Sequence, residues 1–290
     1  MLGGTAGRCD DSGHQLAAVT VNKTANIPMG FWGVTKTAAL TLTAGRTTFN
    51  DAASMKSLDI TAVDTSWFKI SFYDTGNASI CGGINLWDGR DTIGGDLDIG
   101  ACTGYFRDSK PLHILGDLTI LNTDSSLFQD TVYISGDLTL AVGAKLSSTV
   151  FTFIGNGVHT ITTNGVRLQK VKGKNLTFVG SVSMIPLLTA GGTVTFGAGT
   201  TDSIRTGYSI NGSAGNLVSF RSGTTGTRYI VCLPAKSGVA YMDFMDCGSL
   251  FEINADPNSI NSGNNSNISF YRYGAWKKQG LRPRWTFSMF

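Results

Sequence analysis

The sequence predicts an all-β protein, and specifically a right-handed parallel β-helix whose coils are each roughly 20 residues long. Two observations support this prediction. A Gly-Asp-Leu pattern recurs along the middle of the chain, and the composition is rich in turn formers but poor in the residues that favour helices. An antiparallel β-sandwich or jelly roll remains the alternative fold.

The repeat consists of a glycine, an aspartate, a leucine, a polar residue and a second aliphatic residue. Its clear copies lie at 95–99, 116–120 and 136–140, with offsets of 21 and 20 residues. Weaker copies follow at 157–161, 175–178, 193–196 and 216–220. Each copy alternates apolar and polar residues with a period of two, which is typical of a half-buried strand.

Stacked coils would place equivalent residues of successive repeats about 4.8 Å apart, the spacing of neighbouring strands. We therefore expect two apolar columns inside the helix and one column of aspartates outside it. Because stacked like charges repel, the aspartates should cap turns or tilt apart, with a bound cation as the alternative. The expected columns are Leu97, Leu118 and Leu138; Ile99, Ile120 and Leu140; and Asp96, Asp117 and Asp137.

Composition also narrows the fold and the functions to be expected. The chain has 37 glycines and 6 prolines among its 290 residues, and Glu252 is the only glutamate. A net charge of +3 is too small to indicate nucleic-acid binding, and no apolar run is long enough to predict a membrane span. The first residues lack the layout of a secretory signal. The five cysteines are scattered, which predicts neither a disulfide framework nor a zinc site, and no cofactor is expected.

The chain is expected to have three parts. Residues 1–50 lack the repeat and are predicted to be an N-terminal capping or docking segment, and residues 51–270 are predicted to form the β-helix. Residues 271–290 are a basic, aromatic tail without an acid, predicted to dock on another subunit or to fold back over the last coil. The candidate docking residues are Trp276, Lys277, Lys278, Arg282, Arg284, Trp285 and Phe290.

Three segments near the C-terminus, at 215–222, 241–246 and 262–270, resemble the closing coils of parallel β-helix proteins. Such proteins occur in bacteriophage virions and tails and in bacterial surface proteins. Ile268 stands about where that pattern usually has a tryptophan. The resemblance implies the fold and a virion or surface setting, and it implies no catalytic residues.

Carboxylate pairs are the first candidates for an enzyme, because glycoside hydrolysis needs two carboxylates that face one cleft. Asp243 with Asp246, and Asp88 with Asp91, are close enough in sequence to be considered, and Glu252 could join the first pair. Residues three apart on a strand point to opposite faces, so we expect these acids to be turn and surface residues.

Histidines and cysteines give no catalytic pattern. His14, His113 and His159 are scattered and are expected to be structural or exposed. Cys81 and Cys102 are 21 residues apart, one repeat length, and are expected to be buried thiols on adjacent coils. No nucleotide-binding, hydrolase or zinc-protease motif is present in the sequence.

Taken together, the sequence predicts a non-enzymatic structural component of a bacteriophage particle. The expected place is a tail fibre, tail spike or tail tip, with roles in assembly and host attachment. Expected partners are other virion proteins, further copies of the chain as a trimer by analogy with fibres, and a host surface glycan or receptor, but not nucleic acid. The expected location is the virion, assembled in the host cytoplasm. A bacterial adhesin fragment and a polysaccharide depolymerase are the alternatives.

Overall fold

The computed structural model describes the chain in segments. They are residues 8–10, 15–16, 19–21, 29–32, 35–37, 40–42, 47–49, 53–55, 58–60, 66–68, 72–74, 78–80, 84–86, 91–100, 105–108, 111–121, 125–128, 131–146, 149–184, 187–204, 209–233 and 237–270. In the strands up to β13, and in β16 and β19, only the backbone is described, except at Ala78.

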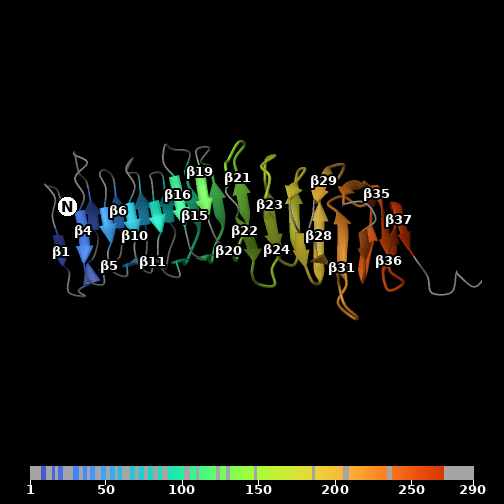
Figure 1. Ribbon diagram of the computed structural model, residues 1–290, viewed down its shortest axis with the longest axis horizontal. Coiled ribbons are helices and arrows are strands. Elements are labelled where there is room, and N and C mark those ends of the chain that lie inside the picture. Colours follow the sequence, from blue (N-terminus) through green and yellow to red (C-terminus); the bar gives the residue numbers. More distant parts are fainter. Residues whose placement is uncertain are drawn as a thin grey trace, which may run out of the picture.

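The molecule is an elongated parallel β-solenoid, with its strands stacked along one long axis (Figure 1). The described residues contain strands and no helix. Successive strands along the chain fall into different sheets, and each strand pairs with the equivalent strand of the next coil. The predicted fold class is confirmed, and the sandwich alternative is wrong because every pair of named strands is parallel.

Sheet A has 13 strands and extends along nearly the whole stack. Its strands are β3 (Val19–Val21), β6 (Leu40–Leu42), β9 (Leu58–Ile60), β12 (Ala78–Ile80), β15 (Leu97–Ile99), β18 (Leu118–Ile120), β21 (Leu138–Leu140), β23 (His159–Thr162), β25 (Leu176–Val179), β28 (Gly192–Phe196), β31 (Val218–Ser222), β34 (Met242–Met245) and β36 (Ile260–Gly263).

Sheet C has 11 strands and forms a second face of the solenoid. Its strands are β2 (Gln15–Leu16), β5 (Thr35–Thr37), β8 (Ala53–Met55), β11 (Phe72–Asp74), β14 (Asp91–Ile93), β17 (Leu112–Ile114), β20 (Thr131–Ile134), β22 (Val150–Phe153), β24 (Lys170–Lys172), β27 (Leu187–Thr189) and β30 (Ser209–Ile210).

The third face is divided between two sheets. Sheet B covers it in the N-terminal half with β1 (Arg8–Asp10), β4 (Met29–Trp32), β7 (Thr47–Phe49), β10 (Ser66–Phe68), β13 (Ile84–Leu86), β16 (Tyr105–Asp108) and β19 (Ser125–Phe128). Sheet D covers it in the C-terminal half with β26 (Ser183–Met184), β29 (Thr201–Ile204), β32 (Tyr229–Cys232), β33 (Ser237–Val239), β35 (Cys247–Ala255) and β37 (Ser266–Phe270).

The two predicted apolar columns are confirmed. Leu118 lies opposite Leu97 on one side and Leu138 on the other, and Ile99, Ile120 and Leu140 are joined in the same way. All six side chains are at most 2% exposed. Further along sheet A the column becomes aromatic, with Phe196, Phe220 and Phe244 in successive ring contacts. The core is therefore one continuous apolar cluster along the axis.

The aspartates of the repeat cap the neighbouring coil, as expected. The backbone N–H of Asp117 donates to Asp96 Oδ1 at 2.9 Å, and that of Asp137 donates to Asp117 Oδ1 at 2.8 Å. The last aspartate accepts a hydrogen bond from the N–H of Thr160 at 2.7 Å. Each side chain thus satisfies a backbone donor of the next coil, where no ladder bond would reach it.

The glycines of the repeat make room for these aspartates. A Cβ on Gly136 would clash with Asp117 Oδ1 and would lie 2.7 Å from the carbonyl carbon and oxygen of Gly116. Gly116 itself faces Asp96 in the same way. The Gly-Asp pair is therefore one structural unit: the missing side chain on one coil provides the space that the aspartate of the previous coil occupies.

The predicted boundary at residue 50 does not coincide with an end of the sheets. Seven strands, β1 to β7, lie between Arg8 and Phe49, and they pair in parallel within sheets A, B and C. The stack therefore begins well before residue 51, and the expectation of a segment without the repeat needs correction. Val19-Thr20-Val21 and Leu40-Thr41-Leu42 follow the same alternation as Leu58-Asp59-Ile60 and occupy the same column. They lack the preceding Gly-Asp pair.

Candidate ligand-binding groove

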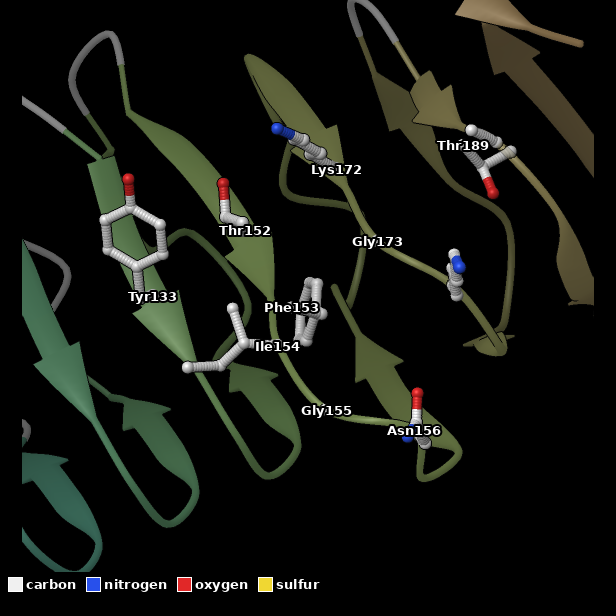
Figure 2. Close-up of a pocket in the computed structure, with 11 residues that line it drawn as sticks. Tyr133, Thr152, Phe153, Ile154, Gly155, Asn156, Lys172, Gly173 and Thr189 are labelled. Carbon is white, nitrogen blue, oxygen red and sulfur yellow. The ribbon is translucent and has the colours of Figure 1, made fainter.

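A groove of about 630 Å³ lies along sheet C (Figure 2). It crosses four successive strands, β20, β22, β24 and β27, and includes residues that follow the last three of them. The groove therefore runs parallel to the solenoid axis. Its lining residues are Tyr133, Thr152, Phe153, Ile154, Gly155, Asn156, Lys172, Gly173, Lys174, Thr189 and Ala190.

Strand alternation produces the lining. Val132, Phe151 and Val171 point into the core and are at most 1% exposed. The next residue on each strand must point outward, because successive side chains of a strand alternate between faces. These outward residues are in register across three strands and form a row in Figure 2: Tyr133, Thr152 and Lys172.

An aromatic stack supports one end of the groove. The rings of His113 and Tyr133 lie on neighbouring strands with centroids 4.5 Å apart and planes inclined by 13°. Since His113 covers one face of the Tyr133 ring, the other face lies on the side of Thr152, its register neighbour on β22. Stacking on the His113 ring holds the Tyr133 ring in a fixed orientation. The ring is therefore a rigid platform at the edge of the groove.

Two turns that border the groove contain glycines, so no side chain projects into the channel at those positions. Gly155 follows β22 with a φ of 104°, a conformation that residues with a side chain rarely adopt, and a Cβ there would meet nothing within 4 Å. Gly173 follows β24, where a Cβ would lie 2.9 Å from Cβ of Phe153. Because both positions lack a side chain, the backbone and Asn156 border an open channel.

Positive charge is concentrated around the groove. No aspartate or glutamate occurs between Asp137 and Asp202. That stretch carries five basic residues: Lys145, Arg167, Lys170, Lys172 and Lys174. Lys172 and Lys174 line the groove and are exposed. Clusters of one sign raise the local concentration of oppositely charged ligands. This acid-free stretch was the sequence signal that could have found the groove, and the small net charge of the whole chain hid it.

The predicted docking residues of the tail lie outside the described residues. They are Trp276, Lys277, Lys278, Arg282, Arg284, Trp285 and Phe290. The role of the tail in contacting another subunit therefore stays a prediction.

The candidate carboxylates do not share a cleft within the described structure. Asp243 forms an ion pair with Arg221 and accepts a hydrogen bond from Ser262 Oγ. Asp246 instead accepts from Asn264 Nδ2 at 2.6 Å and from the Gly226 N–H at 2.9 Å. These two hydrogen bonds hold the pKa of Asp246 below its ordinary value. Asp246 therefore holds the turns at Gly226 and Asn264, although it is only 2% exposed, whereas Asp243 joins its strand to β31 and β36.

The other carboxylate candidates from the sequence are Glu252, Asp88 and Asp91. Glu252 is exposed and accepts a hydrogen bond from Ser269 Oγ at 2.6 Å. Asp88 lies outside the described residues, and for Asp91 only the backbone of β14 is described. None of the described groove residues carries a carboxylate.

Two of the three histidines can be placed. His113 belongs to the stack beside the groove, whereas His159 is 2% exposed on β23 with Nδ1 2.9 Å from the Gly136 carbonyl oxygen. Since a carbonyl only accepts, that nitrogen carries the proton. His14, Cys81 and Cys102 lie outside the described residues. Among described residues, no group of three or more His, Cys, Asp or Glu could hold a metal ion.

A polar cluster lies inside the C-terminal coils, under sheet D. Burial raises the pKa of Asp202, although hydrogen bonds from Thr200 Oγ1 and the Val182 N–H act in the opposite direction. Burial also raises the pKa of the Cys247 thiol to about 12 and that of the fully buried Tyr229 well above its usual range. These groups favour their neutral forms, so the cluster is part of the core and Cys247 is a poor nucleophile.

Comparison with family models, with curated proteins and with solved structures produced no match. No helix in the described segments is both long and apolar enough to cross a membrane.

Proposed function

We propose that the chain is a non-enzymatic structural component of a bacteriophage particle, forming part of a tail fibre, tail spike or tail tip that acts in assembly and host attachment. The observation that carries the proposal is the uninterrupted sheet A, whose 13 parallel strands extend from β3 to β36. With strands about 4.8 Å apart, the 12 intervals between those strands make a stack of about 58 Å.

The role of such a stack is mechanical. Each coil buries its inner face only against its two neighbours, so stability is a sum over adjacent coils. The Asp96, Asp117 and Asp137 bonds add links between coils, along with the apolar columns. A rod built in this way keeps its two ends at a fixed separation and presents long side faces. Those are the properties that a fibre or spike segment requires.

The particle setting is supported by the segments that resemble closing coils of phage β-helix proteins. In the structure they contribute to β31, β34 and β36, the last three strands of sheet A, and to β37, the last strand described. Partners on this proposal are other virion proteins and further copies of the chain, with a trimer by analogy with fibres. The basic aromatic tail, which follows the last coil in sequence, is the proposed docking element.

The test is immunogold electron microscopy of intact phage particles, with antibodies raised against this chain. We expect gold at the tail or tail tip, because a fibre or spike component is present in every finished particle. Gold on the bacterial envelope, with bare particles, would contradict the proposal and favour an adhesin. Particles from which the gene has been deleted provide the control for antibody specificity.

The groove along sheet C favours a depolymerase as the second candidate, because it is long enough to hold part of a polysaccharide. Its described lining offers an aromatic ring, ammonium groups and an amide, which are groups that hold a ligand. Glycoside hydrolysis needs two carboxylates on either side of the bond that is broken. A glycan-release assay with capsular polysaccharides separates the two candidates: release of reducing ends would show that the chain is an enzyme.

A further inference from the structure

The groove has the dimensions of a site for a linear polymer. Its lining spans four adjacent strands of sheet C, or about 14 Å at the usual strand spacing. It is open along its length, since Lys172, Lys174, Gly155, Asn156 and Ala190 are all exposed. A ligand that lay in it could extend beyond both ends. A small, compact metabolite would leave most of such a channel unfilled.

The lining also has a specific chemistry. The ring of Tyr133, fixed by His113, offers an apolar face with a hydroxyl at its edge. Two strands further along, Lys172 places an ammonium group about 10 Å away along the axis, and Lys174 lies beside it on the following turn. The amide of Asn156 lies between these positions in the chain and lines the same groove. The ligand should therefore combine flat apolar faces, hydroxyls and negative charges.

We propose that this groove binds an acidic polysaccharide, a chain of pyranose rings that carry carboxylates. The apolar face of a ring would stack on Tyr133, and carboxylates one or two rings away would pair with Lys172 and Lys174. The inference rests on the proposed function, because it names the host-surface ligand of a chain that acts in attachment.

Charge complementarity selects this ligand over a neutral glycan. The stretch from residue 138 to 201 has five basic residues and no acid, so the field over the groove is positive. Among described residues neither Lys172 nor Lys174 has an ion pair, and both side chains are exposed. A neutral polymer would leave Lys172 and Lys174 without a negatively charged partner.

The same lining does not favour single-stranded nucleic acid. Sites for single strands stack successive bases on several aromatic side chains along a basic groove. Here the half-buried Tyr133 is the one aromatic ring with an accessible face among the described lining residues, since Phe153 is only 5% exposed. We therefore expect single-stranded DNA to bind more weakly than an acidic polysaccharide, and the test includes it as a comparison ligand.

The test is calorimetric titration of the 290-residue chain with polygalacturonate oligomers at about 0.15 M salt, where the Debye length is about 8 Å. The double variant Lys172→Gln, Lys174→Gln should bind at least about tenfold more weakly, the loss expected from about 1.4 kcal/mol of removed charge pairing. Affinity for the wild type should also fall as salt rises. Neutral dextran oligomers, sulfated dextran and single-stranded DNA serve as comparison ligands.

The matched control is the double variant Lys145→Gln, Arg167→Gln, which removes the same charge at exposed positions outside the groove lining. It should bind within about twofold of the wild type, since long-range charge contributes little once screened. A second groove variant, Tyr133→Leu, removes the aromatic ring. If its unfolding midpoint equals that of the wild type, any loss of affinity measures the contribution of that ring to binding. Equal losses in the groove and control variants would overturn the proposal.

Three other results would also overturn it. They are no binding of polygalacturonate by the wild type, equal binding of neutral dextran, and tighter binding of DNA. Stronger binding of sulfated dextran would assign the groove to sulfate rather than carboxylate groups and would overturn the carboxylate assignment. These outcomes are distinct from failure of the proposed function. If the chain is found in particles but does not bind uronate, only the groove proposal is overturned. If it binds polygalacturonate and the absorbance of unsaturated uronate products then increases, the chain cleaves the polymer and is an enzyme.

Discussion

At the scale of single residues, the Gly-Asp pair shows how two small sequence choices depend on each other. The aspartate reaches across to the backbone N–H of the next coil, and the glycine there leaves the space that the carboxylate needs. The pattern is therefore recognisable in sequence because a steric requirement and a hydrogen bond coincide. Either residue alone would be an ordinary turn former.

Replacing Gly136 by alanine should destabilise the protein by about 2 kcal/mol or more, as expected for overpacking a tight site. The new Cβ would clash with Asp117 Oδ1, and it would also lie 2.7 Å from the backbone of Gly116, which cannot move without disturbing the stack. Urea unfolding followed by circular dichroism measures the loss. Gly157→Ala is the matched control, since a Cβ there would meet nothing within 4 Å, and it should change stability by less than about 0.5 kcal/mol.

Asp202 should make the protein less stable as pH rises through the acidic range. Its side chain is 0% exposed, and burial raises its pKa above the ordinary value of 3.8. Since the folded state binds this proton more tightly, the associated stability is present below the unfolded pKa and is lost as pH rises through the folded pKa. Asp202→Asn should therefore be more stable than the wild type at pH 7, and the difference should shrink toward pH 3. Unfolding in urea at several pH values measures it.

Hydrogen bonding around Asp202 explains why asparagine fits. Thr200 Oγ1 lies 2.7 Å from both the Gly197 carbonyl oxygen and Asp202 Oδ2, but a hydroxyl has only one proton to donate. An amide, like a protonated carboxyl, can donate to Thr200 and leave that proton for Gly197. Asp246→Asn is the opposite control: the pKa of Asp246 is lowered, so this variant should lose stability at neutral pH. A wild type and an Asp202→Asn protein with parallel pH profiles would refute the assignment.

At the scale of elements, the sequence allowed strands to be predicted wherever turn and strand signals agreed. The columns through Leu118 and Ile120 were predicted correctly because Gly-Asp marks the turn and the period of two marks the strand. The strand at Val19–Val21 was missed because it keeps the period but lacks that turn, whereas the strand at Leu40–Leu42 could be predicted but not assigned to the stack. A strand of three residues has too little periodicity to be identified alone.

The third face could not be predicted for a different reason. Sheet B ends at β19 and sheet D begins at β26, so the described residues of the coils between them form no named strand on that face. No residue pattern comparable to Gly-Asp marks this interruption in the sequence. The groove was hidden likewise, because His113 and Tyr133 are 20 residues apart and meet only through the register of β17 and β20.

At the scale of the whole molecule, a solenoid should lose structure locally, since each coil contacts only its neighbours. Leu118 is fully buried between Leu97 and Leu138, and Leu118→Ala should cost about 3 kcal/mol for the cavity left in the column. That cost falls on the coils around β18, whereas β31 and β34 are held by the aromatic part of the core, several coils further along sheet A.

Hydrogen exchange followed by mass spectrometry should therefore show faster exchange in peptides that contain β15, β18 and β21 of the Leu118→Ala variant, with little change in peptides that contain β31 and β34. Thr119→Ala, on the outward side of the same strand, is the matched control and should leave both regions within about 0.5 kcal/mol of the wild type. A uniform rise in exchange along the chain would mean that the coils unfold as one cooperative unit, because neighbour coupling then exceeds the stability of any single coil. Local loss would instead show that the rod tolerates damage in one coil while its distant faces keep their shape.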